Sequence, residues 1–186
     1  MATALRNSNR MTFDEYLAFE ESATIRHELS GGIVFAMSGG TDAHNLITGN
    51  LFLAIAAPLK GRCHTFQAQM KLRVAHLSDS DSYYPDIMVS CSATDRETLF
   101  RREPVLLIEV LSPSTARLDR GEKCLNYLQI PSLLEYVLVS QDVPLVEVMR
   151  RSNTWATEDL YRADTLELDS VGLKIPLSEI YSGITF

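Results

Sequence analysis

The chain has 186 residues, of which 46% are hydrophobic and 22% charged, a composition typical of a globular protein. We therefore expect a single domain over residues 1–186, with a core at 12–150 and a C-terminal strand and turn extension at 151–186. The 24 acidic residues outnumber the 17 Lys and Arg residues, so the formal charge is −7. This excludes a protein that coats nucleic acid by bulk charge, but not one that grips phosphates locally with a few basic residues and a metal ion.

The cysteines and the apolar stretches indicate the cellular setting. Cys63, Cys91 and Cys124 are odd in number, widely spaced and without a Cys-x-x-Cys pattern. We therefore expect three reduced thiols and neither a disulfide framework nor a zinc site. The longest apolar stretch, 51–59, is much shorter than the roughly 20 residues of a membrane span, and the N-terminus lacks the apolar core of a signal peptide. We expect a cytoplasmic protein.

The first elements follow from capping and turn signals. Thr12 and Glu15 form a capping-box pattern, which predicts a short helix that ends near Ser22. The residues 27–37 predict two short strands, joined at the glycines 31–32 because these supply the positive φ angles that hairpins favour.

A longer helix is predicted next. Apolar residues recur at helical spacing from Asp42 to Lys60, with Asp42 placed to cap the start and Gly61 to terminate it. Between Cys63 and His76 the alternation predicts a strand, followed by a polar loop over 77–82.

The remaining elements complete a mixed α/β fold. The run 105–111 is apolar on both faces and is typical of a central strand. The other predicted elements are a strand at 85–89, a helix from about Leu118 to Gln129 stopped by Pro131, strands at 135–140 and 145–150, an alternating segment at Leu166 and Leu168, and a last turn within 175–180. The expected fold class is α/β, with a mixed β-sheet core flanked by helices and an additional N-terminal helix and hairpin.

Two acidic residues lie in the apolar strands. Asp86 follows Pro85, and Glu109 lies in the middle of the most apolar run. A buried carboxylate must be protonated, paired or bound to a cation. If the strands are neighbours, Asp86, Glu109 and the Val110 carbonyl can bind one Mg²⁺ ion, which prefers oxygen ligands. Alternatively, Asp86 caps a turn after Pro85. This alternative does not suit Glu109, because Glu109 lies in the middle of an apolar run.

These residues belong to a recognisable series of motifs. Pro85-Asp86 is followed by the string 108–114, Ile-Glu-Val-Leu-Ser-Pro-Ser, and then by Asp119, Lys123 and Tyr127 at helical spacing. This series resembles the Uma-type family of putative restriction endonucleases, a branch of the PD-(D/E)XK nuclease superfamily. The resemblance covers about 13–148. It implies a restriction-endonuclease-like fold and a two-carboxylate Mg²⁺ or Mn²⁺ site that activates water for DNA phosphodiester cleavage.

The sequence departs from the superfamily pattern at one catalytic position. The lysine expected two residues after Glu109 is Leu111. Lys123, on the next predicted helix, can supply the ammonium, although an ordinary exposed pair with Asp119 would explain it too. Lys71, on a different strand, is the competing donor.

Further candidates support the site or bind substrate. The resemblance implies that a glutamate of the first hairpin, here Glu28, lies near the metal site. His44 lies in the first turn of the long helix, where anions bind readily. Gln69 can orient a water molecule. A surface position for Glu28 and Gln69 and a packed or capping role for His44 are the alternatives. Asp119 and Tyr127 share a polar helix face with Lys123.

We therefore expect a Mg²⁺-dependent DNA endonuclease in which Asp86, Glu109 and Lys123 are catalytic and which acts as a homodimer, since double-strand cutters often work as two-fold pairs. A second interpretation, motivated by Leu111, is a catalytically inactive nuclease fold that binds nucleic acid or a protein partner. A third uses the carboxylates as an acid/base pair on a sugar, but the single tryptophan, Trp155, offers little aromatic surface for one.

Overall fold

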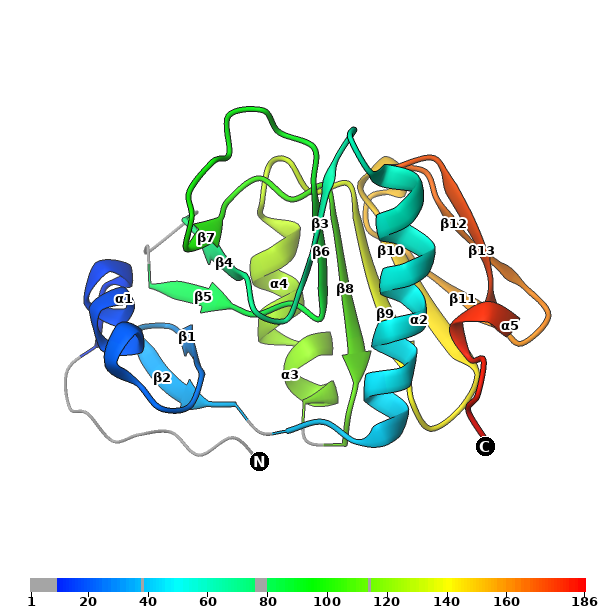
Figure 1. Cartoon of the computed structure of the whole chain (residues 1–186), viewed down its shortest axis with the longest axis horizontal. Coiled ribbons are helices and arrows are strands. Elements are labelled where there is room, and N and C mark those ends of the chain that lie inside the picture. The colour runs from blue at the N-terminus through cyan, green and yellow to red at the C-terminus, as the bar shows by residue number, and fades with distance from the viewer. Residues whose placement is uncertain (1–9, 38, 76–79, 114) are drawn as a thin grey trace.

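The computed structural model describes residues 10–37, 39–75, 80–113 and 115–186. Their strands form three sheets of six, five and two strands. Figure 1 shows the six-stranded sheet near the centre, the five-stranded sheet beside it with the N-terminal helix, and the two-stranded sheet near the C-terminus. The predicted mixed α/β fold is confirmed.

The six-stranded sheet carries the predicted central strand. Its order is β11 (Thr157–Tyr161), β10 (Leu145–Arg150), β9 (Glu135–Ser140), β8 (Leu106–Leu111), β6 (Ile87–Ser90) and β3 (His64–Gln67). Only the β8–β9 pair is parallel among these neighbours. Because a parallel pair needs a crossover connection, the chain between β8 and β9 forms α3 (Ala116–Arg120) and α4 (Glu122–Leu128).

Two cores cover β8, which explains why all six of its residues are buried. One core joins Ile108 and Val110 to α2 (Asp42–Leu59) and to the C-terminal segments. The other joins Leu107 and Leu111 to α4 and to the five-stranded sheet. Side chains alternate along a strand, so Glu109 projects into the second core.

The five-stranded sheet packs beside this second core. Its order is β2 (Ile33–Ala36), β1 (His27–Ser30), β5 (Asp81–Tyr83), β4 (Lys71–Val74) and β7 (Phe100–Arg101). The helix α1 (Phe13–Ser22) buries Phe13 and Tyr16 against Leu29 and Phe100 in a third core. The predicted capping box of α1 and the hairpin are confirmed, with Gly31 and Gly32 at φ 55° and 80°.

The C-terminal segments add to the first core. They comprise the 3₁₀ turn η1 (Arg151–Asn153), strand β11, the hairpin β12 (Thr165–Leu168) and β13 (Leu173–Pro176), and α5 (Leu177–Ile180). The side-chain amide of Asn50 on α2 donates to the Ile180 carbonyl at 3.0 Å. The buried Glu135 carboxylate accepts hydrogen bonds from the backbone of Asp169 and Ser170. These contacts tie the extension to the central sheet.

Two predicted helices differ at their boundaries. Thr41, not Asp42, caps α2, because its hydroxyl accepts the His44 amide at 3.1 Å. The helix predicted at 118–129 starts at Ala116 and is broken at Gly121. A Cβ atom on Gly121 would lie 2.8 Å from the Arg117 carbonyl oxygen, so the close turn between α3 and α4 requires glycine.

The strand predicted over 63–76 is wrong as a continuous element. The chain turns at 68–70, so β3 pairs with β6 in the central sheet and β4 pairs with β5 in the other. Of the predicted loop at 77–82, residues 77–79 lie outside the described residues and 81–83 form β5. The strands β7 and β11 were not predicted.

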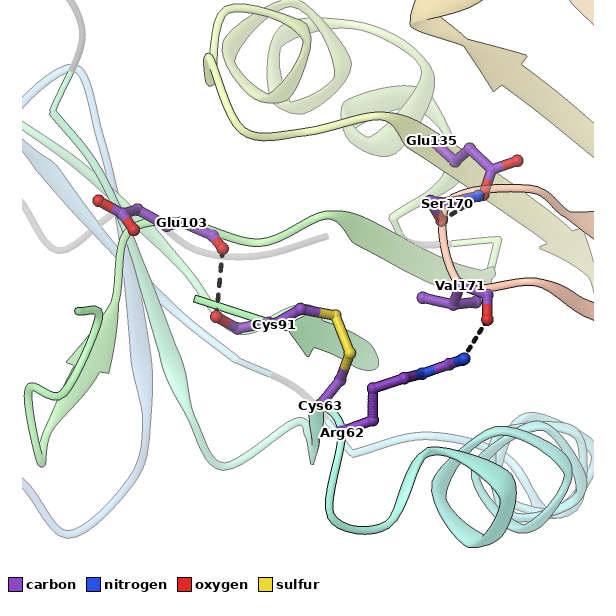
Figure 2. The surroundings of a disulfide bond; sticks show 8 residues. Arg62, Cys63, Cys91, Glu103, Glu135, Ser170 and Val171 are labelled. Carbon is purple, nitrogen blue, oxygen red and sulfur yellow. Dashed lines mark hydrogen bonds between the residues drawn. A yellow bond between two sulfur atoms is a disulfide. The ribbon is translucent and has the colours of Figure 1, made fainter. Parts of the chain in front are cut away.

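The expectation of three reduced thiols is also wrong. Cys63 and Cys91 form a disulfide, which joins the start of β3 to the end of β6 (Figure 2), and Cys124 is free and buried. The strand register explains the pairing, since His64 and Ser90 are direct neighbours across the ladder. In the described part of the chain, no helix combines the length and apolar character required to cross a membrane.

Candidate active site

A cavity of about 160 Å³ lies where the two larger sheets meet the helices. Strands β1 and β8, the β5–β6 link, the first turn of α2 and the helices α3 and α4 all contribute to its wall. The charged and titratable side chains around it are Glu28, His44, Tyr83, Tyr84, Asp86, Glu109, Asp119, Glu122 and Lys123. The cavity is therefore a place where carboxylates gather from segments far apart in the sequence.

Asp86 is positioned by the ladder between β6 and β8. Because Ile87 pairs with Ile108, Asp86 lies opposite Glu109. The Asp86 amide donates to Glu109 Oε2 at 3.3 Å, and the Val110 amide donates to Asp86 Oδ2 at 2.8 Å. These two bonds hold both acids at the same end of the ladder.

His44 contacts the same oxygen of the Asp86 carboxylate that accepts the Val110 amide. Its Nε2 atom lies 3.1 Å from Asp86 Oδ2. This hydrogen bond raises the pKa of His44, with a smaller contribution in the same direction from the Val110 backbone, although burial opposes the shift. The helix α2 thereby contributes a histidine that orients Asp86.

Glu109 lies in the second core and is only 3% exposed. Its Oε1 atom is 3.0 Å from the Lys123 ammonium and accepts the Tyr127 hydroxyl at 2.9 Å. Burial raises the pKa of Glu109 well above its ordinary value, while Lys123 lowers it and the neighbouring acids raise it. Burial and the Glu109 charge raise the pKa of Tyr127, which keeps the phenol a hydrogen-bond donor.

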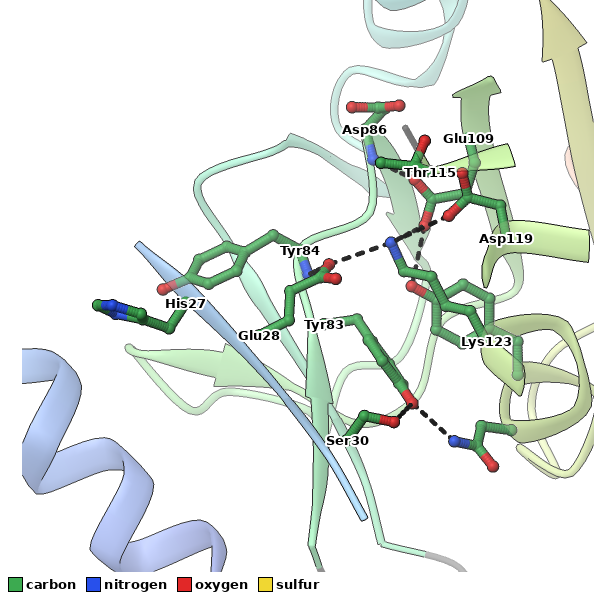
Figure 3. A network of polar contacts seen from close by, with 12 residues as sticks. His27, Glu28, Ser30, Tyr83, Tyr84, Asp86, Glu109, Thr115, Asp119 and Lys123 are labelled. Carbon is green, nitrogen blue, oxygen red and sulfur yellow. Dashed lines mark hydrogen bonds and ion pairs between the residues drawn. The ribbon is translucent and has the colours of Figure 1, made fainter. Parts of the chain in front are cut away.

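Lys123 reaches three carboxylates at once (Figure 3). Besides Glu109, its Nζ atom lies 3.0 Å from Glu28 Oε1 and 3.5 Å from Asp119 Oδ1. Burial would lower the pKa of Lys123, but Glu109, Glu28 and Asp119 together raise it well above its ordinary value. The group is therefore a fixed ammonium at neutral pH.

The site holds more acid than base. Glu28, Glu109 and Asp119 surround the ammonium of Lys123, and Asp86 pairs with His44. Burial raises the pKa of Asp119, and its Oδ1 atom has no hydrogen-bond partner, only the ion pair to Lys123. Uncompensated buried negative charge is costly, so the acids that Lys123 does not balance must be protonated or bound to a further cation.

The donor atoms fit a hard divalent ion. Carboxylates and a backbone carbonyl are the oxygen ligands that Mg²⁺ accepts, and Mg²⁺ uses only one or two carboxylates and keeps several waters. Within residues 10–37, 39–75, 80–113 and 115–186, no three His, Cys, Asp or Glu side chains form a ready-made metal cluster. This is compatible with a site of two carboxylates and one carbonyl, but not with a zinc-type cage.

The remaining predicted residues separate into two groups. Glu28, His44 and Asp119 line the cavity, and Tyr127 contacts Glu109 from the core below it. Two others lie outside the cavity wall. Gln69 is exposed in the turn between β3 and β4, and Lys71 lies beside the Tyr84 ring.

Leu111 occupies the position of the expected lysine. It lies on the same face of β8 as Glu109, is 4% exposed and packs in the second core. The ammonium at Glu109 instead comes from Lys123 on α4.

Sequence reasoning missed one polar chain in the cavity wall. The Ser30 hydroxyl donates to Glu122 Oε1 at 2.6 Å and lies 2.9 Å from the Tyr83 hydroxyl, which also accepts a bond from Asn126 at 2.7 Å. In sequence, Ser30 signals only a hairpin turn. The polar face of α4 was the one available signal, because Glu122 and Asn126 are spaced one helical turn apart.

Comparison with known proteins identifies the family. A family model described as "Uma2: Putative restriction endonuclease" matches residues 13–178. The chain belongs to the Uma2 family. Two uncharacterized proteins of Synechocystis sp. strain PCC 6803 are similar to it: slr1290 is 33% identical, with 95% of this chain and 94% of that protein covered, and sll1609 is 36% identical, with 70% and 75% covered.

A solved structure shares the fold of this Uma2 protein. The crystal structure of a protein from Anabaena variabilis ATCC 29413, described as a putative nuclease belonging to DUF820, superposes with a TM-score of 0.77. The match covers 92% of this chain and 98% of the other, at 19% sequence identity. It supports the fold assignment alone.

Proposed function

We propose that this Uma2 protein is a Mg²⁺- or Mn²⁺-dependent endonuclease that hydrolyses DNA phosphodiester bonds. The observation that carries the proposal is the position of Lys123, whose ammonium meets the Glu109 carboxylate at 3.0 Å beside Asp86. Glu109 on β8, Asp86 just before β6 and a lysine at one cavity form the combination that the family resemblance implies for metal-assisted hydrolysis. Here the lysine is displaced from the strand to the following helix.

Asp86, Glu109 and the Val110 carbonyl are the groups that would hold the ion. When bound, a divalent ion polarises a phosphate oxygen and lowers the pKa of a coordinated water molecule. His44 keeps Asp86 oriented through its Nε2 contact, which is the role that outer-sphere partners of metal ligands have in general.

Lys123 acts as a charged hydrogen-bond donor. Because its pKa is raised, it does not act as the base that deprotonates water. It orients the attacking water and stabilises the negative charge that develops on the phosphate oxygens. Water attacks phosphorus and loses one proton to the solvent, the P–O bond to the leaving nucleotide breaks, and the leaving oxygen takes up a proton from the solvent. Glu28 and Asp119 position Lys123 for this task.

Leu111 favours a second candidate function. A nuclease fold without a strand lysine can serve as a catalytically inactive module that binds nucleic acid or a protein partner. In that case Lys123 is a structural counter-ion for three buried acids, and no divalent ion is needed. The two functions differ in metal dependence.

The test is cleavage of supercoiled plasmid and single-stranded DNA with Mg²⁺ or Mn²⁺. Wild type is compared with Asp86→Asn and Glu109→Gln, which keep the side-chain shape but remove a carboxylate. The exposed acids Asp159 and Glu179 provide matched controls, as Asp159→Asn and Glu179→Gln. We expect nicking by wild type and both controls only. Cleavage that persists in both site variants contradicts the proposal, and metal-independent DNA binding without cleavage supports the inactive module.

A further inference from the structure

A cationic cluster lies just outside the cavity, around the ring of Tyr84. The Lys71 ammonium is 5.3 Å from the centre of this ring, and the Arg26 guanidinium is 5.9 Å from it. Arg26 Nη1 also donates to the Ala68 carbonyl at 2.8 Å, which ties the turn between β3 and β4 to the start of β1. Two cations from distant segments are thus held on one aromatic side chain.

Neither cation forms an ion pair with a carboxylate of the described residues. Among the residues whose positions are described, no carboxylate oxygen lies within 4.0 Å of Arg26 or Lys71, whereas Lys123 has three such partners. The Glu20 carboxylate acts on this cluster through its charge, but its direct contacts are with other groups. It pairs with His27 at 3.0 Å and accepts a hydrogen bond from the Tyr84 hydroxyl at 3.0 Å. An anion that approaches this cluster would therefore meet two cations whose charge Glu20 balances only in part.

Lys71 is held there at some electrostatic cost. Burial lowers the pKa of its ammonium, Glu20 raises it, and the adjacent Arg26 guanidinium lowers it further. Both the partial burial and the like charge are relieved by an anionic ligand. The geometry and the charge of the cluster thus point in the same direction.

Tyr84 connects this cluster to the candidate active site. It lines the cavity, and its amide donates to Glu28 Oε1 at 3.1 Å. In Figure 3 its ring points away from the acids, toward His27. Asp86 is two residues further along the chain, a step of about 7 Å in extended backbone. Because Tyr84 borders both the cavity and the cationic cluster, a DNA strand bound at one of these places runs next to the other.

We propose that Arg26 and Lys71, held by the Tyr84 ring, form the anchor for the DNA backbone on one side of the phosphodiester that is cleaved. The location of the cleaved bond rests on the proposed function, whereas the anchor itself is a statement about binding. Arg26 offers a planar fork for two phosphate oxygens and Lys71 a point charge. Since these contacts read no base edges, the anchor contributes affinity without sequence preference.

The experiment measures DNA binding without cleavage. Fluorescence anisotropy of a labelled DNA duplex is recorded in Ca²⁺, which takes the same oxygen ligands as Mg²⁺ with a different geometry. The variant Arg26→Ala/Lys71→Ala is compared with Arg162→Ala/Lys174→Ala, a pair of exposed cations on the C-terminal segments. Both double variants lower the net charge by the same amount, so the total charge lost is matched between them.

The two double variants should differ in salt dependence. Each phosphate contact contributes about 0.9 to the slope of log affinity against log salt concentration. We expect the Arg26/Lys71 variant to bind at least about tenfold more weakly and to lose about 1.8 from this slope, whereas the control keeps the wild-type slope. The single variant Lys71→Gln leaves the Arg26–Ala68 bond intact. Its salt-dependence slope should fall by about half as much, so the proposal can still be tested if the double variant misfolds.

The outcomes separate the anchor from the nuclease. Equal slopes for the Arg26/Lys71 variant and its control overturn the anchor, even if wild type cleaves DNA. Wild type that binds through these residues but never cleaves overturns the nuclease and leaves the anchor in place. Wild type that neither binds nor cleaves DNA overturns both.

Discussion

The Lys123 ammonium lies 3.0 Å from Glu109 Oε1, on a helix that the chain reaches only after leaving β8 and turning at Gly121. The parallel pairing of β8 and β9 causes this arrangement, because the crossover between them must pack over the strand face from which Glu109 projects. A lysine on the following helix can therefore contact the strand carboxylate, and Leu111 at the strand position packs in the core.

Replacing Lys123 by Met should destabilise the protein strongly. The change leaves Glu28, Glu109 and Asp119 without their ammonium, and breaking a buried ion pair in this way costs about 3–5 kcal/mol. Burial already raises the pKa of Glu109 and Asp119, and removal of Lys123 raises the folded-state pKa of these two acids further above the unfolded values. The resulting penalty is absent below the unfolded pKa values and grows as the pH rises toward the folded ones.

Urea denaturation measures this effect. The loss in unfolding free energy should be larger at about pH 8 than at about pH 5, where the carboxyl groups of the unfolded chain begin to protonate. Arg120→Met removes the half-exposed Arg120–Glu147 pair and should cost less than about 1 kcal/mol. A similar loss for both variants contradicts the assigned role of Lys123.

Gly121 controls the position of Lys123 and should not accept a side chain. In Gly121→Ala, the new Cβ would meet the Arg117 carbonyl at 2.8 Å, so α3 and α4 must move apart, at a cost of about 1–3 kcal/mol. Cleavage should fall with it, because Lys123 shifts relative to Glu109. Gly49→Ala is the matched control, since nothing lies within 4 Å of its Cβ, and helix propensity predicts a gain of about 0.5–1 kcal/mol. Thermal melts and nicking assays of both variants decide the point.

Sequence patterns predicted the parts of the fold that depend on local signals. Local patterns predict three of these elements without knowledge of the rest of the fold. They are the capping box of α1, the paired glycines of the first hairpin and the continuous apolar run of β8. The break between β3 and β4 was missed because apolar alternation continues across the turn, with Phe66 and Leu72 packing in the same core.

Sequence reasoning placed the acids of the site better than their partners. An acid within an apolar strand, as at Glu109, is conspicuous by itself, and so is a lysine on an otherwise buried helix face. The contacts of Ser30 with Glu122 and Tyr83 join three elements, and no local pattern encodes them. The same holds for Cys63 and Cys91, which become neighbours only through the register of β3 and β6.

Reduction of the disulfide should lower stability without changing the site residues. The bond closes a loop with a sequence separation of 28, for which the chain-entropy relation gives about 3–4 kcal/mol. We expect Cys63→Ser/Cys91→Ser to lose about this much unfolding free energy in urea, and wild type to lose the same amount on addition of a reductant. Cys124→Ser, at the free buried thiol, keeps the disulfide and should lose the same amount as wild type on addition of a reductant. A reductant effect of equal size in the double variant contradicts the assignment.

A divalent ion should stabilise the folded protein through Asp86 and Glu109. At a concentration of about 100 times its dissociation constant, a ligand that binds only the folded state adds about 2.7 kcal/mol, which corresponds to about 5–10 °C in melting temperature for a chain of this size. Because burial raises the pKa of Glu109, binding must displace a proton, so the shift should increase with pH. Thermal melts with Mg²⁺, Mn²⁺ and EDTA measure it. Asp86→Asn and Glu109→Gln should abolish the shift and Asp159→Asn should retain it, whereas an equal shift in all variants places the ion elsewhere.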